Sequence, residues 1–233
     1  EAVDAVVDLR DAQTDGDGHL PAGMFDDEFA DGLAQALGDC GGFRQGRLHQ
    51  GDGELLAAEP AHQILVTEHA AADGGNAAQD FIAGRMAEAI KHRGPDDGAV
   101  WSDPSAGVAL GHRRLSILDL STAGHQPMRD APGECWITYN GEIYNYIELR
   151  AQLEALGFQF ATASDTEVLL AAWEAWGVEA LPRLNGMWAL AFLDLRERRL
   201  VLSRDRFGEK PLFYRHDRSF FTFASEIAAL LVD

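Results

Sequence analysis

Two short stretches of the chain carry residue types that could attack or bind a small substrate. Cys40 precedes two glycines, which would let a substrate approach a thiol nucleophile closely, although a cysteine there could equally be an ordinary small buried residue. Arg113 and Arg114 interrupt an apolar segment, and because successive strand side chains point to opposite faces, one of them should point inward. A buried guanidinium needs a carboxylate partner, from the protein as a structural ion pair or from a ligand.

A third stretch, Asn140-Gly141-Glu142, directly follows an apolar strand pattern. Asn-Gly usually marks a hairpin turn, but a helical pattern follows here, so we expect both residues beside a helix N-terminus. Donors held in advance at such a place can stabilise a developing negative charge. Glu142 and Asp165 each fall near an expected helix start, where the helix dipole alone would explain a carboxylate.

The elements that must position these residues can be read from periodicity. Helical spacing is found at 81–92, ending at Arg93-Gly94-Pro95, at 144–157, ending at Gly157, and at 165–176 after a capping box at 164–167. Strand patterns are found at 99–101, 107–112, 135–140, 187–205 (two strands), 211–214 and 220–225, before a short closing helix. Because helix and strand runs are segregated, we predict an α+β fold in which helices pack on a sheet.

Charge and composition narrow the function classes. The 233-residue chain has a net charge of −19, which argues against nucleic acid or an anionic membrane as a partner. Two cysteines cannot form a disulfide framework, no apolar run is long enough to cross a bilayer, and no signal peptide is visible. We therefore expect a soluble, cytoplasmic protein, and we predict no metal site.

The first part of the chain differs from the rest. Residues 1–79 contain 16 Asp and Glu against 3 Lys and Arg, and all Trp and Tyr lie after position 100. High charge with few aromatic residues is typical of weak core formation. We therefore place a boundary near residue 80 and expect 1–79 to be an acidic, atypical segment, disordered or misread, ahead of a domain at 80–233.

Several motifs occur in a fixed order between residues 84 and 231. They are HRGPDD (92–97), GHRRLSILDLSTAGHQP (111–127), NGEIYN (140–145), SDTEVLL (164–170), RLNGMWALAFLD (183–194), RDRFGEKPLFY (204–214) and FASEIAALL (223–231). Taken singly, the first reads as a helix exit with solvated charges and the sixth as a structural turn between strands. Taken together, the string closely resembles the glutaminase domain of glutamine-hydrolysing asparagine synthetase, a class II (N-terminal nucleophile) amidotransferase.

This resemblance implies a four-layer αββα sandwich that hydrolyses glutamine to glutamate and ammonia without a cofactor. Arg114 matches the arginine that binds the α-carboxylate of glutamine, Asn140 and Gly141 match the oxyanion hole, and two acidic positions match the groups that receive the α-amino group. The substrate-binding positions implied in this way are Arg114, Leu115, Ser116, Ile117, Leu118, Asn140, Gly141, Glu142 and Asp165.

The family mechanism uses a cysteine that begins the mature chain, with its own α-amino group as the base. A free α-amine has a pKa of about 7.7–8.0, which suits proton transfer near neutrality, whereas a peptide nitrogen cannot act in this way. Cys40 could take this role only after cleavage behind Asp39. Its sequence departs from the family opening, Cys-Gly-Ile-Ala-Gly, and it lies 52 positions before His92 instead of roughly thirty.

Three functions remain open at this stage. The first is the glutaminase half of an asparagine-synthetase-like enzyme, whose partner would be a C-terminal synthetase domain, absent from this chain, that uses ATP and Mg²⁺ to amidate aspartate. The second is a glutamine-binding or structural module that lacks the nucleophile. The third is a relative that amidates another acceptor. For the assembly, a homodimer is an open alternative.

Overall fold

The computed structural model describes residues 5–8, 63–67, 75–115, 124–216 and 221–232, and these residues contain two five-stranded antiparallel sheets. The first sheet contains, in spatial order, β1 (Ala5–Asp8), β8 (Arg199–Arg204), β7 (Gly186–Asp194), β6 (Cys135–Ile143) and β5 (Met128–Arg129). The second contains β3 (Asp97–Asp103), β4 (Val108–Arg114), β2 (Gln63–Thr67), β10 (Phe221–Ala224) and β9 (Phe213–His216).

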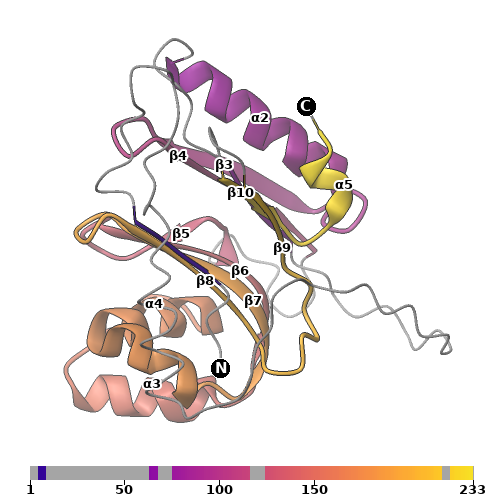
Figure 1. Cartoon of the computed structure of the whole chain (residues 1–233). Coiled ribbons are helices and arrows are strands. Elements are labelled where there is room, and N and C mark those ends of the chain that lie inside the picture. The colour runs from indigo at the N-terminus through magenta and orange to yellow at the C-terminus, as the bar shows by residue number, and fades with distance from the viewer. Residues whose placement is uncertain (1–4, 9–62, 68–74, 116–123, 217–220, 233) are drawn as a thin grey trace, which may run out of the picture.

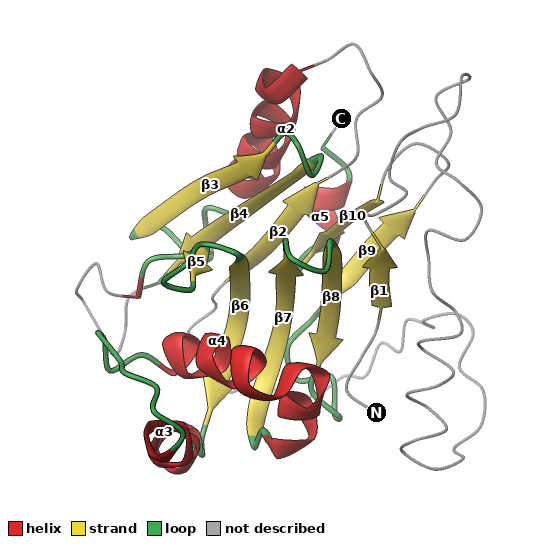
Figure 2. Ribbon diagram, turned by 90° about the vertical axis from the view of Figure 1, so that its left-hand side faces the viewer, coloured by secondary structure: helices red, strands yellow, loops and turns green. Residues whose placement is uncertain are grey.

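The helices lie on the outer faces of the two sheets. Helices α2 (Gly75–Ala89) and α5 (Ile227–Leu230) lie beside the second sheet, while α3 (Tyr146–Ala155) and α4 (Asp165–Trp176) lie beside the first (Figure 1). A short 3₁₀ helix, η2 (Gly177–Arg183), continues from α4. The view turned by 90° shows α4 across β6 and β7 (Figure 2). The expected α+β class with segregated helices and antiparallel strands is therefore confirmed.

Strand β7 shows why both faces of the first sheet are buried. Its apolar run is continuous, as expected for a strand covered on each side. Trp188 and Phe192 belong to the apolar core under α3 and α4, whereas Ala189 and Ala191 belong to the core between the sheets. One strand thus contributes to two separate cores through simple alternation.

The core between the sheets brings the strands that matter for the site into one space. It contains Val108 and Leu110 of β4, three alternating residues of β7, and the phenylalanines of β10. At one edge, the rings of Trp101 on β3 and Trp136 on β6 stack with their centroids 3.9 Å apart. The inward faces of β4 and β6 therefore share the same interior.

The N-terminal part of the chain contributes more structure than its composition suggests. Strand β2 pairs with β4 on one side and with β10 on the other, and β1 pairs with β8. The boundary that we placed at residue 80 lies inside α2, which begins at Gly75. Both strands are short apolar segments within an acidic stretch, so a composition average over 79 residues conceals them.

The expected position of the Asn140-Gly141 pair is corrected by the structure. We predicted that the strand ends there and that a helix N-terminus follows. Instead β6 continues to Ile143, because β7 pairs with it residue by residue as far as Gly186. Helix α3 begins only at Tyr146, so Asn140 and Gly141 lie inside a strand.

The structure confirms the predicted helix end at Gly157 and confirms one half of the capping box predicted at 164–167. Gly157 follows α3 with φ of +100°, the left-handed conformation that favours glycine. The Ser164 hydroxyl accepts a hydrogen bond from the N–H of Thr166 at the start of α4. Glu167, however, does not complete the capping box: its carboxylate accepts from the N–H groups of Ala161 and Thr162 in the preceding loop.

Candidate functional site

The paired arginines at the end of β4 point to opposite faces, as their spacing predicts. The Arg113 Nε donates to the Ala87 carbonyl of α2 at 3.2 Å, and its guanidinium forms an ion pair with Glu88. Arg114 alternates with Val108 and Leu110 and is only 6% exposed. The inward arginine is therefore Arg114, and it faces the interior between the sheets.

The HRGPDD motif holds the backbone of Arg114 in place. The Asp96 N–H donates to the Arg114 carbonyl at 3.1 Å. A Cβ at Gly94 would lie 2.5 Å from the carbonyl carbon of Arg113, so only glycine allows this close approach. The preceding Arg93 binds Glu226 of the FASEI motif with a distance of 2.6 Å between Nη1 and Oε1. The motif is a turn, as predicted, and its charges are tied to neighbouring elements.

Residues 124–126 connect this turn to β6. The His125 Nδ1 lies 2.7 Å from Oδ2 of Asp97, the last residue of HRGPDD. Burial alone would raise the pKa of Asp97, but the hydrogen bonds from His125 and the Gly98 N–H, with the nearby charge of Arg114, hold that pKa below its ordinary value. Gln126 is buried, and its Oε1 accepts from the Tyr139 N–H at 2.7 Å.

Strand β6 presents a polar row to the interior between the sheets. Thr138 and Asn140 share a face with Trp136, whereas Ile137 and Tyr139 point to the core under the helices. Asn140 is 1% exposed, and within the described residues neither its Oδ1 nor the Thr138 hydroxyl has a hydrogen-bond partner. Buried polar atoms without partners are costly in a finished core, so they are candidates for contact with a ligand.

Gly141 is required by the close pairing of β6 and β7. It lies opposite Trp188, and a Cβ at this position would collide with the carbonyl oxygen of Met187. On the other side of Trp188, the buried Asp205 accepts from the Trp188 N–H at 3.3 Å, while the Asp205 N–H donates to the Trp188 carbonyl at 2.8 Å. The backbone around Gly141 is thus held from a second strand that is itself anchored.

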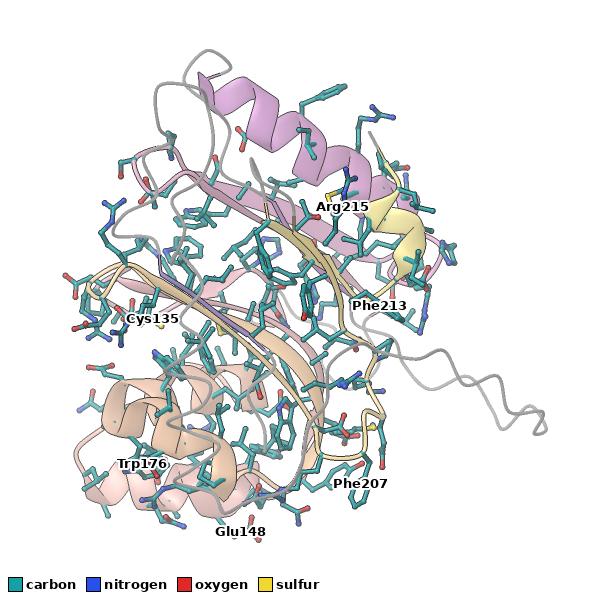
Figure 3. All side chains as sticks on the ribbon, viewed as in Figure 1. Cys135, Glu148, Trp176, Phe207, Phe213 and Arg215 are labelled. Atoms are coloured by element: carbon teal, nitrogen blue, oxygen red, sulfur yellow. The ribbon has the colours of Figure 1, made fainter. Side chains whose placement is uncertain are left out.

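The RDRFGEKPLFY segment is a structural turn, in agreement with its interpretation from the sequence. The Asp205 carboxylate accepts from three further backbone N–H groups of the turn, those of Phe207, Glu209 and Lys210, each at 3.0 Å. Gly208 supplies the left-handed conformation that the turn requires, with φ of +67°. Phe207 projects outward at the edge of the molecule (Figure 3).

The two acidic candidates lie in different surroundings. The Asp165 Oδ2 accepts from the Tyr139 hydroxyl at 3.0 Å and from the Ile143 N–H at 3.1 Å, which places it on the helix side of β6, near the end of the strand. Burial raises the pKa of Asp165 despite these hydrogen bonds. Glu142, two residues after Asn140, is exposed. The Asp165 carboxylate therefore reaches the end of β6 from the helix side, whereas the Asn140 side chain faces the other sheet.

Of the two cysteines, the structure describes Cys135 and not Cys40. The predicted pocket residues Ser116, Ile117 and Leu118 also lie outside the described residues, whereas Leu115, directly after β4, is half-buried. Cys135 is fully buried, and burial together with the charges of Asp194 and Asp130 raises the pKa of its thiol far above the ordinary value. A buried thiol that stays protonated near neutral pH is a poor nucleophile, and Cys135 belongs to the core under the helices, so its interpretation as a packing residue is confirmed.

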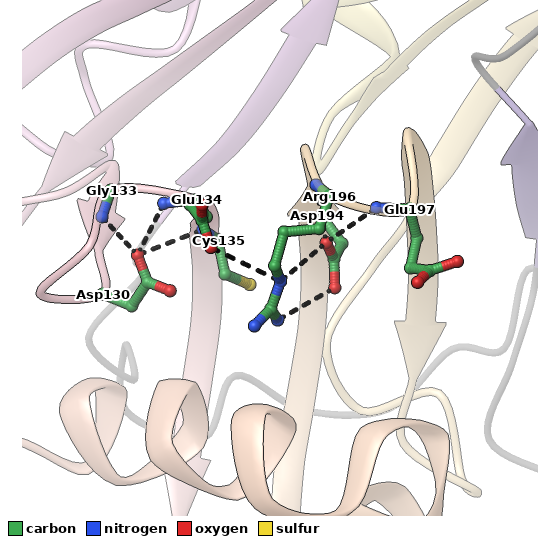
Figure 4. A network of polar contacts seen from close by, with 7 residues as sticks. All are labelled: Asp130, Gly133, Glu134, Cys135, Asp194, Arg196 and Glu197. Atoms are coloured by element: carbon green, nitrogen blue, oxygen red, sulfur yellow. Dashed lines mark hydrogen bonds and ion pairs between the residues drawn. The ribbon is translucent and has the colours of Figure 1, made fainter.

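Cys135 also begins β6 within a polar network that fixes the strand's first residues (Figure 4). Asp130 Oδ1 accepts from the N–H groups of Gly133, Glu134 and Cys135 at 2.7, 2.8 and 3.1 Å. Beside them, Arg196 is paired with Asp194 at 3.2 Å. The polar contacts at this end of β6 therefore fix the backbone, and the candidate site lies nearer the other end of the strand.

Two negative observations concern the described part of the chain. It contains no group of three or more His, Cys, Asp or Glu side chains that could hold a metal ion. None of its helices combines the length and apolar character needed to cross a membrane.

Sequence reasoning missed two residues that hold the backbone of the site, Gln126 and Asp205. Each lies in a quoted motif, but its role depends on an atom of a distant strand. A Gln between His and Pro and an Asp ahead of a Gly-containing turn are the only local signals, and neither identifies the partner.

Comparisons with known proteins agree with the motif string. The family model described as glutamine amidotransferase domain matches residues 70–233. The putative asparagine synthetase (glutamine-hydrolyzing) 2 of Methanocaldococcus jannaschii is 40% identical over 163 residues, which cover 63% of this chain and 31% of that protein. Asparagine synthetase (glutamine-hydrolyzing) 3 of Bacillus subtilis is 44% identical over 149 residues, which cover 63% of this chain and 24% of that protein.

Among solved structures, glutamine phosphoribosylpyrophosphate amidotransferase from B. subtilis matches with a TM-score of 0.60 and 20% sequence identity. The match covers 72% of this chain and 43% of that chain. At this identity the likeness concerns the fold alone. The chain thus spans less than a third of the length of the two asparagine synthetases and less than half of this structural relative.

Proposed function

Because the chain belongs to the glutamine amidotransferase domain family, we propose that it is the glutaminase part of an asparagine-synthetase-like amidotransferase. In this proposal it releases ammonia from glutamine, and its two sheets with outer helices form the four-layer αββα sandwich of N-terminal nucleophile hydrolases. The order of layers in Figure 1 and the fold likeness to an amidotransferase support this arrangement.

The observation that carries the proposal is the burial of Arg114 on the face of β4 that looks toward Asn140 of β6. Arginine binds carboxylates through two parallel hydrogen bonds, which suits the α-carboxylate of an amino acid. An arginine facing the space between the sheets, with a polar row opposite, matches the requirements for holding one end of glutamine and polarising the other. The position of Arg114 after the HRGPDD turn supports the same role.

Asn140 and Gly141 are proposed as the oxyanion hole. Attack of a thiolate on the side-chain amide converts the carbonyl oxygen into an oxyanion, which fixed N–H donors stabilise. The strand geometry supplies such fixed donors, because β7 and Asp205 hold the backbone of this part of β6. The Asn140 side chain is buried beside this backbone, and its amide N–H₂ group is the side-chain donor of the proposed oxyanion hole.

Asp165 and Glu142 are proposed to receive the α-amino group, with Leu115 to Leu118 lining the pocket. A carboxylate near the end of β6 complements an ammonium group, and the raised pKa of Asp165 means that an incoming cation would favour its ionised form. Its present hydrogen bonds to Tyr139 and Ile143 require that it use its other oxygen for this purpose.

The nucleophile of the proposed reaction is Cys40, exposed by cleavage after Asp39. Its thiolate would attack the amide carbon to form a γ-glutamyl thioester, the amide nitrogen would leave as ammonia with a proton from the α-amine, and water would then release glutamate. The alternative is a glutamine-binding module without this chemistry. Intact mass after incubation with a glutamine-mimicking diazo-ketone separates them: a species beginning at Cys40 with one adduct supports hydrolysis, and an unmodified full-length chain supports the module.

The acceptor of the ammonia is a separate proposal. We propose aspartate, amidated with ATP and Mg²⁺ by a synthetase domain corresponding to the part of the relatives that this chain does not span. A different acceptor is the alternative.

The binding role of Arg114 can be tested with its neighbour as the control. Arg114→Ala is expected to weaken L-glutamine binding about tenfold or more in calorimetric titration, since a charge-assisted contact to the α-carboxylate is lost. Arg113→Ala also removes an arginine side chain, but one that contacts α2 on the opposite face of β4. It should leave the affinity for L-glutamine within about twofold. Equal affinities for the wild type and Arg114→Ala would overturn the assignment.

A further inference from the structure

Gly124 lies directly against the guanidinium of Arg114. A Cβ built on Gly124 would be 2.5 Å from Nη2, 2.9 Å from Cζ and 3.4 Å from Nε of Arg114. Three atoms of one planar group thus face a single α-carbon, and both residues are buried. Among the described glycines, only Gly124 would bring a Cβ within 3.5 Å of three atoms of one guanidinium.

The residues that follow Gly124 hold it in that position from two directions. His125 is bound to Asp97 beside the turn that supports the Arg114 backbone. Gln126 accepts the Tyr139 N–H, one residue before Asn140, where a neighbouring strand would otherwise supply the acceptor. We call residues 124–126 the bridging segment, because it touches Arg114 on β4 and the backbone next to Asn140 on β6.

We propose that Gly124 is a positioning residue that sets where the Arg114 guanidinium meets the α-carboxylate of the substrate. This inference rests on the proposed function, in which Arg114 binds that carboxylate. The guanidinium is planar and presents its donors in a rigid fork, so a displacement of an ångström misaligns both hydrogen bonds at once. By fixing the guanidinium, Gly124 would increase the preference of the site for ligands that carry an α-carboxylate.

A single methyl group is enough to test the idea. Alanine at 124 must displace the guanidinium, which is the far end of a flexible side chain, so the fold can absorb the change while the binding geometry cannot. The backbone of Gly124 is outside the left-handed region, so alanine can adopt it without strain. Gly84 on α2 offers a matched control, because a Cβ there meets no atom within 4 Å.

The experiment compares calorimetric affinities for L-glutamine and L-glutaminamide, in which an amide replaces the α-carboxylate. In the full chain, Gly124→Ala should weaken L-glutamine binding about tenfold and narrow the preference for L-glutamine over L-glutaminamide, as Arg114→Ala also should. Gly84→Ala should change neither quantity. In an Arg114→Ala background, Gly124→Ala should add no further loss, because it acts through that side chain.

Each outcome decides a different point. An unchanged preference in Arg114→Ala overturns the proposed role of Arg114 itself. If Arg114→Ala loses the preference for L-glutamine over L-glutaminamide but Gly124→Ala keeps it, only the inference about Gly124 is overturned. The same holds if Gly124→Ala weakens the binding of both ligands equally. If Gly124→Ala fails to fold, the double variant is decisive: recovery of cooperative unfolding with Arg114→Ala supports the contact, and failure in both backgrounds means that Gly124 serves the fold alone.

Discussion

Asp165 is the carboxyl group whose surroundings differ most from water among the residues proposed for the site. It accepts hydrogen bonds from Tyr139 and Ile143, yet burial raises its pKa above the ordinary value. Relative to the protonated form, the ionised carboxylate is therefore less stable in the folded protein than in the unfolded chain. That imbalance links the stability of the fold to pH.

The sign of this linkage gives a prediction for Asp165→Asn. Because the folded pKa lies above the unfolded value of about 3.9, the group contributes stability below that pH and loses the contribution as pH rises through its folded pKa. The wild type should therefore lose stability relative to Asp165→Asn as pH rises above about 4, until the pH exceeds the folded pKa. Urea unfolding at several pH values measures it, with the exposed Asp80→Asn as control; a pH-independent difference would contradict the burial argument.

At the scale of elements, β6 is the strand on which the site depends. Pairing with β7 sets its row of inward polar residues. Along its other edge, the two residues of β5 are the described strand partners, opposite Ile137 and Trp136. Beyond β5, the Gln126 side chain replaces a strand by accepting the Tyr139 N–H. A side chain thus completes the hydrogen bonding of a central strand.

Gln126→Ala should be destabilising by about 1–3 kcal/mol, because it leaves the buried Tyr139 N–H without an acceptor. Gln152→Ala on the exposed side of α3 is the control and should stay within about 0.5 kcal/mol. Denaturant midpoints compared at constant slope give both values. A loss no larger for Gln126 than for Gln152 would show that water or another group satisfies the N–H.

At the scale of the whole molecule, the second sheet is continuous only because of β2. This strand lies between β4 and β10, so the β3-β4 and β9-β10 pairs are joined through five residues that precede α2. A chain limited to 80–233, the domain expected from composition, would lack that strand. It would leave two unpaired strand edges in the middle of a sheet.

Truncation distinguishes the two descriptions of the domain. A chain of residues 75–233 should lose cooperative urea unfolding, because removal of β2 divides the sheet. A chain of residues 63–233 keeps β2 and, of the described elements, loses the edge strand β1 alone, so it should still unfold cooperatively. Circular dichroism followed through the transition reports both; cooperative unfolding of 75–233 would mean that β4 and β10 close without β2.

The sequence by itself determined the features whose causes lie within a few residues. Alternation indicated that one of Arg113 and Arg114 points inward, Gly157 and Ser164 were identified as helix-end residues, and the motif order indicated the family and, through it, Arg114. The short strand β2 was missed because its apolar residues are few within an acidic stretch.

Only the tertiary structure decided the features whose causes lie on another strand. Asn140 and Gly141 stay inside β6 because β7 pairs with them, although Asn-Gly locally favours a turn. Gly124 matters because the guanidinium of Arg114 packs on it, and Asp205 because it binds the backbone of Trp188. Such contacts join residues far apart in the chain, and local periodicity carries no information about which distant atom will be the partner.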